Sequence, residues 1–233
     1  MLFDHTSIGG GVVGFNSTYE IILNIIKFHN RIKIKNHYNF VIIDKKIKNL
    51  EGGIAYSSDL SAFGYFNNPI RLSPKNFINF VKNNNFFKYE LVKSLKNNKG
   101  YVDKQWLKKN FDKIKKPKSK IFQELYLPRL SYGIWQKYRL IQLLDLIDKF
   151  NKKNNDFNIS LTFIEGEADK VIEREDKTIS IKFNEFGNIY KINKSKNNIH
   201  YINTNYKILS LNTIHSTISI GLNPPKDYFK KKN

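Results

Sequence analysis

The chain has 233 residues, enough for one large domain or two small ones with a real hydrophobic core. It contains no cysteine, which excludes disulfides, thiolate metal sites and redox-active dithiols. No apolar run is long enough to cross a bilayer and no signal peptide is visible at the start, so we expect a cytoplasmic protein with no membrane partner.

The formal charge is +20, from 40 Lys and Arg against 20 Asp and Glu. Lys, Asn, Ile, Phe and Tyr dominate the composition, and all of them have A/T-rich codons. A biased base composition therefore explains the charge better than a nucleic-acid surface, which would favour arginine over lysine. We expect no nucleic-acid partner. The alternative, a basic protein for nucleic acid or anionic membrane surfaces, predicts binding that weakens steeply with salt.

The first elements form a strand, a glycine-rich turn, a helix and a second strand. A short strand is expected over residues 3–8, although Asp4, His5, Thr6 and Ser7 make it unusually polar. From residue 12 to about 29 the apolar residues recur at helical spacing. Residues 40–43 are a continuous apolar run that ends at Asp44, which is typical of a strand buried on both faces of a parallel sheet.

The turn between the first strand and the helix carries the dinucleotide fingerprint Gly9-x-Gly11-x-x-Gly14. Glycines allow a tight turn, close approach to a pyrophosphate and close helix–strand packing, and the helix N-terminus attracts phosphate. The predicted cofactor-binding residues of this turn are Gly9, Gly10, Gly11, Val12, Val13 and Gly14. The other explanation is a glycine-rich turn with no ligand.

Asp44, followed by Lys45, ends the second strand thirty residues past Gly14, somewhat farther than the usual offset of about twenty. A carboxylate there can accept hydrogen bonds from ribose hydroxyls. Because no arginine stands beside it, the site favours an unphosphorylated ribose, hence FAD or NAD rather than NADP.

Helices are expected in the middle of the chain and strands in its last third. Ser73-Pro74 predicts a helix start, with Ser73 as the N-cap and Pro74 at the first helical position. We expect a Lys/Asn-rich helical insertion at about 83–120 and an amphipathic helix from about 132 to 151. A β-rich segment follows at about 157–215, with strands over 159–164, 168–174, 178–183, 188–192, 199–202 and 206–211, Gly187 and Asn/Lys clusters as turns, and a last strand at 216–220. Residues 1–233 are expected to form one domain.

Further motifs follow in a fixed order: Gly52-Gly53-Ile54-Ala55-Tyr56, Asn67-Asn68-Pro69 with Ser73, Pro128-Arg129-Leu130-Ser131-Tyr132-Gly133, and Ser219-Ile220-Gly221-Leu222-Asn223-Pro224-Pro225. Together with the glycine turn and Asp44, this order resembles the FAD/NAD(P)-binding family that includes flavin-dependent urate hydroxylase and nitrosuccinate-forming monooxygenase. The resemblance covers residues 8–225. It departs from the family pattern at Trp135, where a second tyrosine would stand, and at Ser219-Ile220, where the family has Ala-Thr.

The resemblance implies an α/β fold: a Rossmann-like FAD/NAD(P)-binding parallel sheet with a helical insertion and a β-meander. It implies that Gly53 lies beside the isoalloxazine, that the Ala168 backbone contacts the adenine, and that Gly221 closes over the pyrophosphate. Asn67 and Arg129 join the cofactor-binding residues by the same resemblance. Arg71 and Arg129 fit two roles equally well: a bidentate contact to the pyrophosphate or to a substrate carboxylate, or a structural contact that holds a loop carbonyl or a surface acid.

The resemblance also implies the function, a FAD-binding, flavin monooxygenase-like oxidoreductase domain that acts on a small-molecule substrate. NAD(P)H is open as the reductant, although no second glycine fingerprint is visible. Family members continue into a second nucleotide-binding segment, so we expect a truncated or split member. The alternative is a non-catalytic nucleotide-binding remnant or subunit that needs a partner chain to complete the flavin site.

No side chain in the sequence is assigned a catalytic role. The five histidines show no metal-ligand spacing, so we expect no metal site. Glu165 and Glu167 fit solvated acids better than a catalytic pair. Tyr132 and Trp135 could line a flavin or substrate pocket, but aromatics at the start of an amphipathic helix more often belong to a core.

Overall fold

The computed structural model describes residues 2–32, 35–47, 50, 52–56, 65–97, 101–116, 119–195 and 198–218. The chain divides into two compact units. One, called here the sheet unit, comprises residues 1–50 and 139–233, and the other, the helical unit, comprises residues 51–138. The helical unit is therefore longer than the insertion expected at 83–120.

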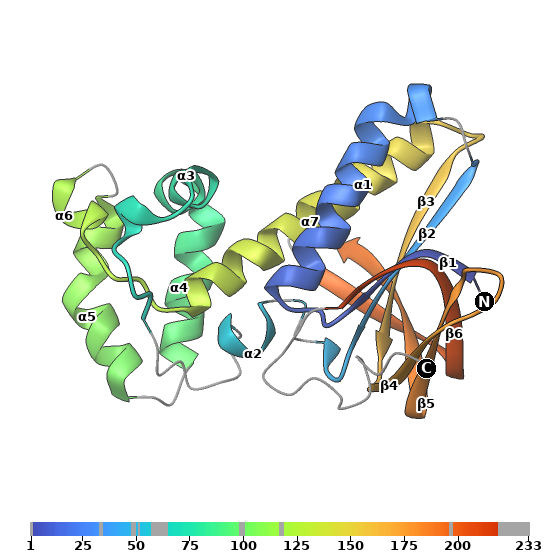
Figure 1. Ribbon diagram of the computed structural model, residues 1–233. Helices are drawn as coiled ribbons and strands as arrows, with labels where there is room; N and C mark the ends of the chain where they lie inside the picture. The colour runs from blue at the N-terminus through green and yellow to red at the C-terminus, as the bar shows by residue number, and fades with distance from the viewer. Residues whose placement is uncertain are drawn as a thin grey trace. The chain divides into compact units, whose positions relative to one another are not determined.

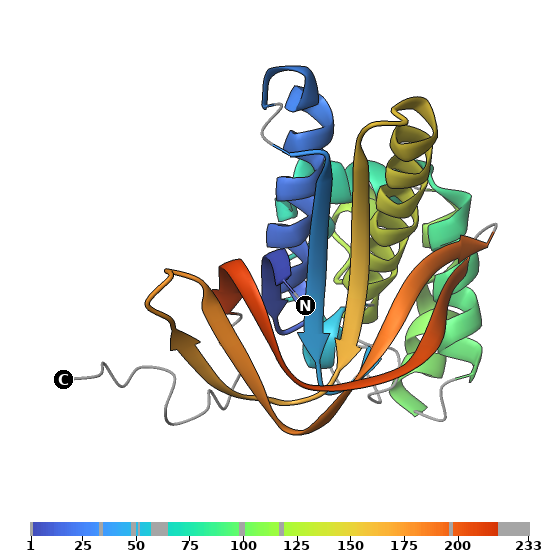
Figure 2. The same ribbon diagram turned by 90° about the vertical axis from the view of Figure 1, so that its right-hand side faces the viewer.

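The sheet unit holds six strands in the order β3-β2-β1-β6-β5-β4 (Figures 1 and 2). The strands are β1 (Leu2–Ile8), β2 (His37–Asp44), β3 (Asn158–Glu165), β4 (Ala168–Glu173), β5 (Ile179–Ser195) and β6 (Asn198–Ile218). Four consecutive strands, β3, β2, β1 and β6, are parallel, whereas β5 runs antiparallel to β6, β4 and β3. The expected α/β class with a mostly parallel sheet is confirmed.

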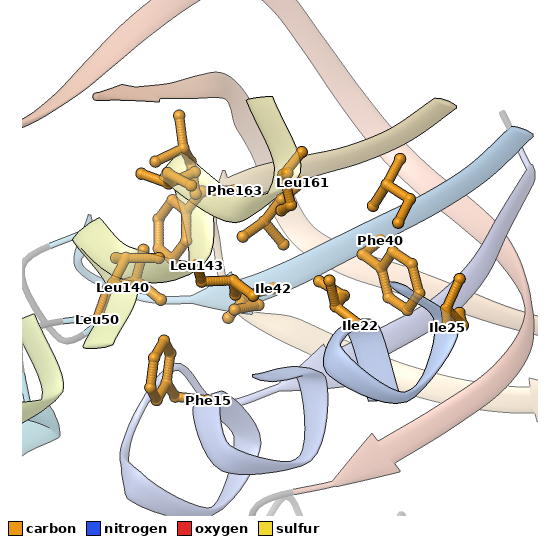
Figure 3. Close-up of a cluster of buried hydrophobic side chains, with 14 of the residues drawn as sticks. Phe15, Ile22, Ile25, Phe40, Ile42, Leu50, Leu140, Leu143, Leu161 and Phe163 are labelled. Atoms are coloured by element: carbon orange, nitrogen blue, oxygen red, sulfur yellow. The ribbon is translucent and has the colours of Figure 1, made fainter. Parts of the chain in front are cut away.

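Helices α1 (Val12–Ile32) and α7 (Leu130–Lys153) supply the apolar side chains that cover one face of the parallel strands, α7 through its part after Tyr138. Figure 3 shows this helix-side core, in which Phe15 and Ile22 from α1 and Leu143 from α7 meet Phe40 and Ile42 of β2. Because successive strand residues point to opposite faces, the neighbouring Val41 and Ile43 enter a second core. Both faces of β2 are thus buried, which explains its continuous apolar run.

The second core lies on the opposite face, beneath the antiparallel strands that Figure 2 shows curling across it. It packs Val41 and Ile43 against Ile181 and Phe183 of β5 and Leu211 of β6. β5 also pairs with β3, so backbone pairing connects β6 to β5 and β5 back to β3. β6 pairs with β1 in parallel, so the strand that leads into the glycine turn has a parallel neighbour on each side.

We expected five short strands between residues 178 and 220. That number was wrong, because the structure has two long strands there, β5 and β6. Gly187 lies inside β5, where a Cβ atom would come within 2.8 Å of Ile164 Cγ2, so glycine is needed for a close approach to β3 and not for a turn. Register shifts beside Gly187 and a positive φ of 59° at Asn205 break the apolar pattern without ending the pairing. Residues 219–220 lie outside the described residues.

The helical unit contains α2 (Gly53–Tyr56), the 3-10 turn η2 (Ile70–Leu72), α3 (Lys75–Asn83), α4 (Asn85–Asn97), α5 (Tyr101–Lys115), α6 (Lys120–Gln123) and the start of α7. Its own core includes Phe77, Val81, Phe87, Leu91 and Phe122, all fully or almost fully buried. Within the range 83–120, the described residues include the helices α4 and α5.

The expected N-cap of α3 was wrong by one residue. Pro74, with an extended ψ of 139°, is the N-cap, and no side chain caps the helix. The Pro74 carbonyl accepts the first helical hydrogen bond, from the amide of Ile78, at 3.0 Å. Ser73 instead closes the preceding 3-10 turn, because its amide donates to the carbonyl of Ile70.

Candidate functional site

The glycine turn joins the carboxyl end of β1 to the N-terminus of α1. Gly9 has a φ of 96°, a conformation that favours glycine, and its amide donates to the carbonyl of Ile43 at 2.7 Å. A Cβ atom on Gly14 would lie only 1.9 Å from the carbonyl oxygen of Gly9. The helix therefore begins directly against the turn, and no side chain fits between them.

The N-terminus of α1 presents a positive dipole end at this turn. The Gly11 carbonyl accepts the first helical hydrogen bond, from Phe15, at 3.0 Å. Gly11 has no side chain with which to cap the helix, and the first turn holds no acidic residue. Val13, in that turn, is 59% exposed. Backbone N–H groups at such a position bind anions, and phosphate above all.

Asp44 holds the glycine turn in place from the end of β2. Its Oδ2 accepts a hydrogen bond from the amide of Gly10 at 2.6 Å, and its Oδ1 accepts one from the amide of Lys46 at 3.3 Å. A Cβ atom on Gly10 would meet Leu50 at 3.2 Å and the Asp44 carboxylate at 3.4 Å. A carboxylate has about four lone-pair positions, so a hydrogen bond to the turn does not by itself prevent one to a ribose.

The segment between β3 and β4 lies beside Asp44. Glu165 is its register partner, and the amide of Gly166 donates to the Asp44 carbonyl at 2.9 Å. Lys45 is exposed and forms an ion pair with Glu167. Ala168, which is buried, begins β4 immediately afterwards. The structure thus brings Asp44, Lys45 and Ala168 to the same edge of the sheet as the glycine turn.

The two glutamates at this edge have structural partners. Glu165 Oε1 accepts from the amide of Ile47 at 3.1 Å, and its Oε2 accepts from the hydroxyl of Tyr190 at 3.2 Å. Glu167 pairs with Lys45. Their contacts support the interpretation that they are not a catalytic pair.

The strand order makes this edge a natural ligand site. The chain leaves β1 through α1 to reach β2 on one side, while β6 pairs with β1 on the other side. In parallel sheets, ligands bind outside the carboxyl ends of the strands at the point where the strand order reverses. The glycine turn lies at that point.

Gly53, Asn67 and Arg129 belong to the helical unit and are described within it. Gly53 has a φ of 65°, and a Cβ atom on its neighbour Gly52 would lie 2.8 Å from the Cα of Gly133. The ring of Tyr56 lies 5.0 Å from that of Tyr132. The motif at 52–56 therefore packs against the motif at 128–133.

The Asn67 motif also joins this group. Tyr65 forms an isolated bridge with Pro128, and the side chain of Arg129 donates to the Tyr65 carbonyl at 3.3 Å. Asn67 itself is exposed. Arg71 pairs with Glu124 at 2.8 Å on the surface. Arg129 thus holds a loop carbonyl and Arg71 pairs with a surface acid. These contacts match the structural role, one of the two roles expected for each arginine.

Tyr132 and Trp135 pack against the core of the helical unit. Their rings lie 5.0 Å apart, and the Trp135 ring lies 5.5 Å from the buried Phe77. These contacts favour the core interpretation over a pocket lining. Gly221, the last predicted cofactor-binding residue, lies outside the described residues.

Arg139 contributes to the site's framework and was missed by the sequence analysis. Its guanidinium donates hydrogen bonds to Asn16 and, at 3.4 Å, to Glu20, and it lies 3.9 Å from the centre of the Tyr19 ring. One α7 side chain thus contacts the second and third turns of α1. A signal existed in the sequence, because Arg139 is one of only five arginines and lies within a leucine-rich helical stretch.

No family model matches the chain, and no curated protein matches it. Within the part of the chain that the structure describes, no helix has the length and apolar character needed to span a membrane. Over the same residues, no group of three or more His, Asp or Glu side chains could hold a metal ion.

Proposed function

We propose that the chain is a FAD-binding oxidoreductase of the flavin monooxygenase-like kind, and that its sheet unit is a Rossmann-like domain that binds the ADP portion of the cofactor. The observation that carries the proposal is the turn between β1 and α1. There Gly14 packs so tightly on Gly9 that only glycine fits, and Asp44 accepts the amide of Gly10. Between β3 and β6 the chain forms β4 and β5, which pair antiparallel to each other. These strands support the expected β-meander.

The residues at the edge of the sheet fit an ADP group. The glycine turn and the N-terminus of α1 would bind the pyrophosphate through backbone amides. Asp44 would accept a hydrogen bond from a ribose hydroxyl, and the backbone near Ala168 would contact the adenine. The carboxylates of Asp44 and Glu165 stand at this edge and would repel a 2′-phosphate, whereas Glu167 is paired with Lys45. An unphosphorylated dinucleotide is therefore favoured over NADP.

The choice of FAD over NAD rests on the resemblance of the ordered motifs. Gly53, Asn67 and Arg129 stay predicted cofactor-binding residues by the same resemblance. A bound flavin would supply the redox chemistry, and the residues of this chain would bind and orient it. Four points remain predictions: NAD(P)H as the reductant, a small-molecule substrate, a partner chain, and the alternative that the chain is non-catalytic.

A titration of the purified protein with FAD tests the proposal, followed by visible absorption and by flavin fluorescence. We expect saturable binding that ADP competes away and that NADP⁺ does not. Asp44→Ala should weaken binding at least about tenfold, because it removes the ribose acceptor and releases the amide of Gly10. Asp145→Ala is the matched control, since Asp145 pairs on the surface with Lys149 and Lys194.

Two outcomes contradict the proposal to different degrees. A protein that binds NAD and ADP but not FAD would retain the dinucleotide site and overturn the flavin assignment. A protein that binds none of these nucleotides would overturn the proposed function altogether.

A further inference from the structure

The two central strands of the sheet are polar where central parallel strands are normally apolar. β1 and β6 pair His5 with His215, Thr6 with Ser216 and Ser7 with Thr217. His5 is 5% exposed and Ser7 is fully buried. Burial of polar groups is costly unless they are hydrogen-bonded, so the partners of His5, Ser7 and Thr217 indicate which element these side chains stabilise.

Two of these side chains, those of Ser7 and Thr217, contact the first two turns of α1. The hydroxyl of Ser7 lies 3.1 Å from the carbonyl oxygen of Gly14 and 2.8 Å from the hydroxyl of Thr18. Thr18, itself buried, also reaches the Gly14 carbonyl at 3.1 Å. His5 Nε2 lies 3.3 Å from Ser7 Oγ, behind this group. A chain of contacts thus runs from His5 to the last glycine of the fingerprint.

A second arm runs from the same imidazole to α1 through β6. His5 Nε2 lies 3.4 Å from the hydroxyl of Thr217, which lies 3.1 Å from the hydroxyl of Ser17. Both arms therefore begin at one nitrogen and end on adjacent turns of the helix whose N-terminus faces the proposed phosphate position.

Counting hydrogens gives the network a direction. Ser7 and Thr18 each have one hydroxyl hydrogen, and an arrangement in which Ser7 donates to Thr18 and Thr18 donates to the Gly14 carbonyl uses both of them. The contact between His5 and Ser7 then needs a hydrogen from the imidazole. In this arrangement His5 is the donor, with its proton on Nε2, and this is the tautomer that the proposal below requires.

We propose that this relay, from the Nε2–H of His5 through Ser7 and Thr18 to the Gly14 carbonyl, positions the phosphate-binding turn of the nucleotide site. The inference rests on the proposed function, since it assigns positioning residues to that site. Gly14 has no side chain by which the sheet can hold it, so its carbonyl is the group available for fixing the first turn of α1. When the relay is removed, the helix N-terminus loses its register against the glycine turn.

The test measures the dissociation constants of FAD, ADP and AMP for the wild type, Ser7→Ala, Thr18→Val and Ser7→Thr, at a temperature where all are folded. Ser7→Ala and Thr18→Val should weaken FAD and ADP about five- to tenfold, as expected for one lost hydrogen bond. AMP, which has no pyrophosphate, should be affected less. Ser7→Thr keeps the hydroxyl and should restore binding.

Ser160→Ala provides the matched control. It removes a hydroxyl from the same sheet, where Ser160 bonds to the side chain of Asn39 near the amino ends of β3 and β2. Its affinities should equal those of the wild type. Nitrogen NMR of His5 supplies a readout that general destabilisation does not move: the imidazole should be neutral, with its proton on Nε2.

The outcomes separate the two proposals. If the wild type binds neither FAD nor ADP, the proposed function fails and the relay loses its role with it. If the wild type binds and Ser7→Ala and Thr18→Val bind equally well, or if His5 carries its proton on Nδ1, the relay alone is overturned. Should Ser7→Ala fail to fold, Thr18→Val decides the question, because valine preserves the shape of threonine.

Discussion

At the scale of single residues, steric limits and hydrogen bonds constrain the site more than apolar packing does. Gly14 is fixed by the 1.9 Å approach that any Cβ would make to Gly9, and Asp44 by its short bond to Gly10. Ser7 of β1 is a further case, because its hydroxyl contacts the Gly14 carbonyl and the Thr18 hydroxyl of α1, with the His5 imidazole behind it. β1 is unusually polar for a buried strand, and under the proposal above its polar side chains position the N-terminus of α1.

The buried imidazole of His5 gives the protein a characteristic pH dependence. Burial, and after it the charge of His215, lowers the pKa of His5 from an ordinary 6.5 to about 4. The groups that face it are Phe40 from β2, the hydroxyls of Ser7 and Thr217, and His215, its neighbour on β6. Between those two pH values the unfolded chain binds a proton that the folded chain does not, so stability falls as the pH is lowered.

Urea denaturation between pH 7.5 and 4 checks this prediction. The wild type should lose stability as the pH falls from about 6.5 toward 4, and His5→Gln, which has no titratable group at this position, should show a shallower dependence. Carboxylates titrate in both proteins, so the difference between the two curves isolates His5. Parallel curves for the two proteins would contradict the assignment.

At the scale of elements, the long antiparallel strands owe their shape to a few unusual backbone positions. The turn between β4 and β5 is tight: the amide of Lys177 donates to the Arg174 carbonyl, and both the amide and the hydroxyl of Thr178 donate to Asp176. This geometry requires a φ of 63° at Lys177. Residues with a Cβ are strained in that left-handed region, and glycine is not.

Lys177→Gly should therefore stabilise the protein, by about 0.5–1 kcal/mol after the greater freedom of glycine in the unfolded chain is counted. Lys177→Val should destabilise it, because a β-branched side chain is worse than lysine at positive φ. Thermal and urea unfolding measure both changes. Lys170→Gly, inside β4, is the control and should be destabilising; a loss of stability in Lys177→Gly as well would refute the strain argument.

At the scale of the whole molecule, the chain has two compact units with separate cores. The helix-side core contains Leu143 and the helical unit's core contains Phe122, and no residue belongs to both clusters. Each core buries its own large side chains, so a cavity in one core should first lower the local stability of its own unit.

Amide hydrogen exchange in two variants, each with one core side chain shortened to alanine, tests this separation. Leu143→Ala should speed amide exchange in β1, β2 and β3, and Phe122→Ala should speed it in α3, α4 and α5, each with a loss of about 3 kcal/mol of local stability. Both residues are fully buried, so each substitution leaves a cavity in the core of its own unit. Equal acceleration of both regions by either variant would show instead a single cooperative structure.

The sequence by itself determined the elements whose signals are local. The apolar run at 40–43, the helical spacing from Val12 onward and the glycine fingerprint each depend on neighbours in the chain, and the structure has the strand, the helix and the turn at those positions. Asp44 could be identified because a strand end and an acidic residue coincide there. The cofactor could not be determined in this way, because a dinucleotide turn is the same for FAD and NAD.

Only the tertiary structure decided features that join distant residues. The pairing of β3 with β5, the division into two units, the contact of Arg139 with α1 and the hydrogen bonds of His5 all link positions far apart in the chain. Gly187 looked like a turn because nothing local distinguishes a turn glycine from one required by a neighbouring strand. Periodicity reports which way a side chain faces, whereas its partner is set by the packing of the whole fold.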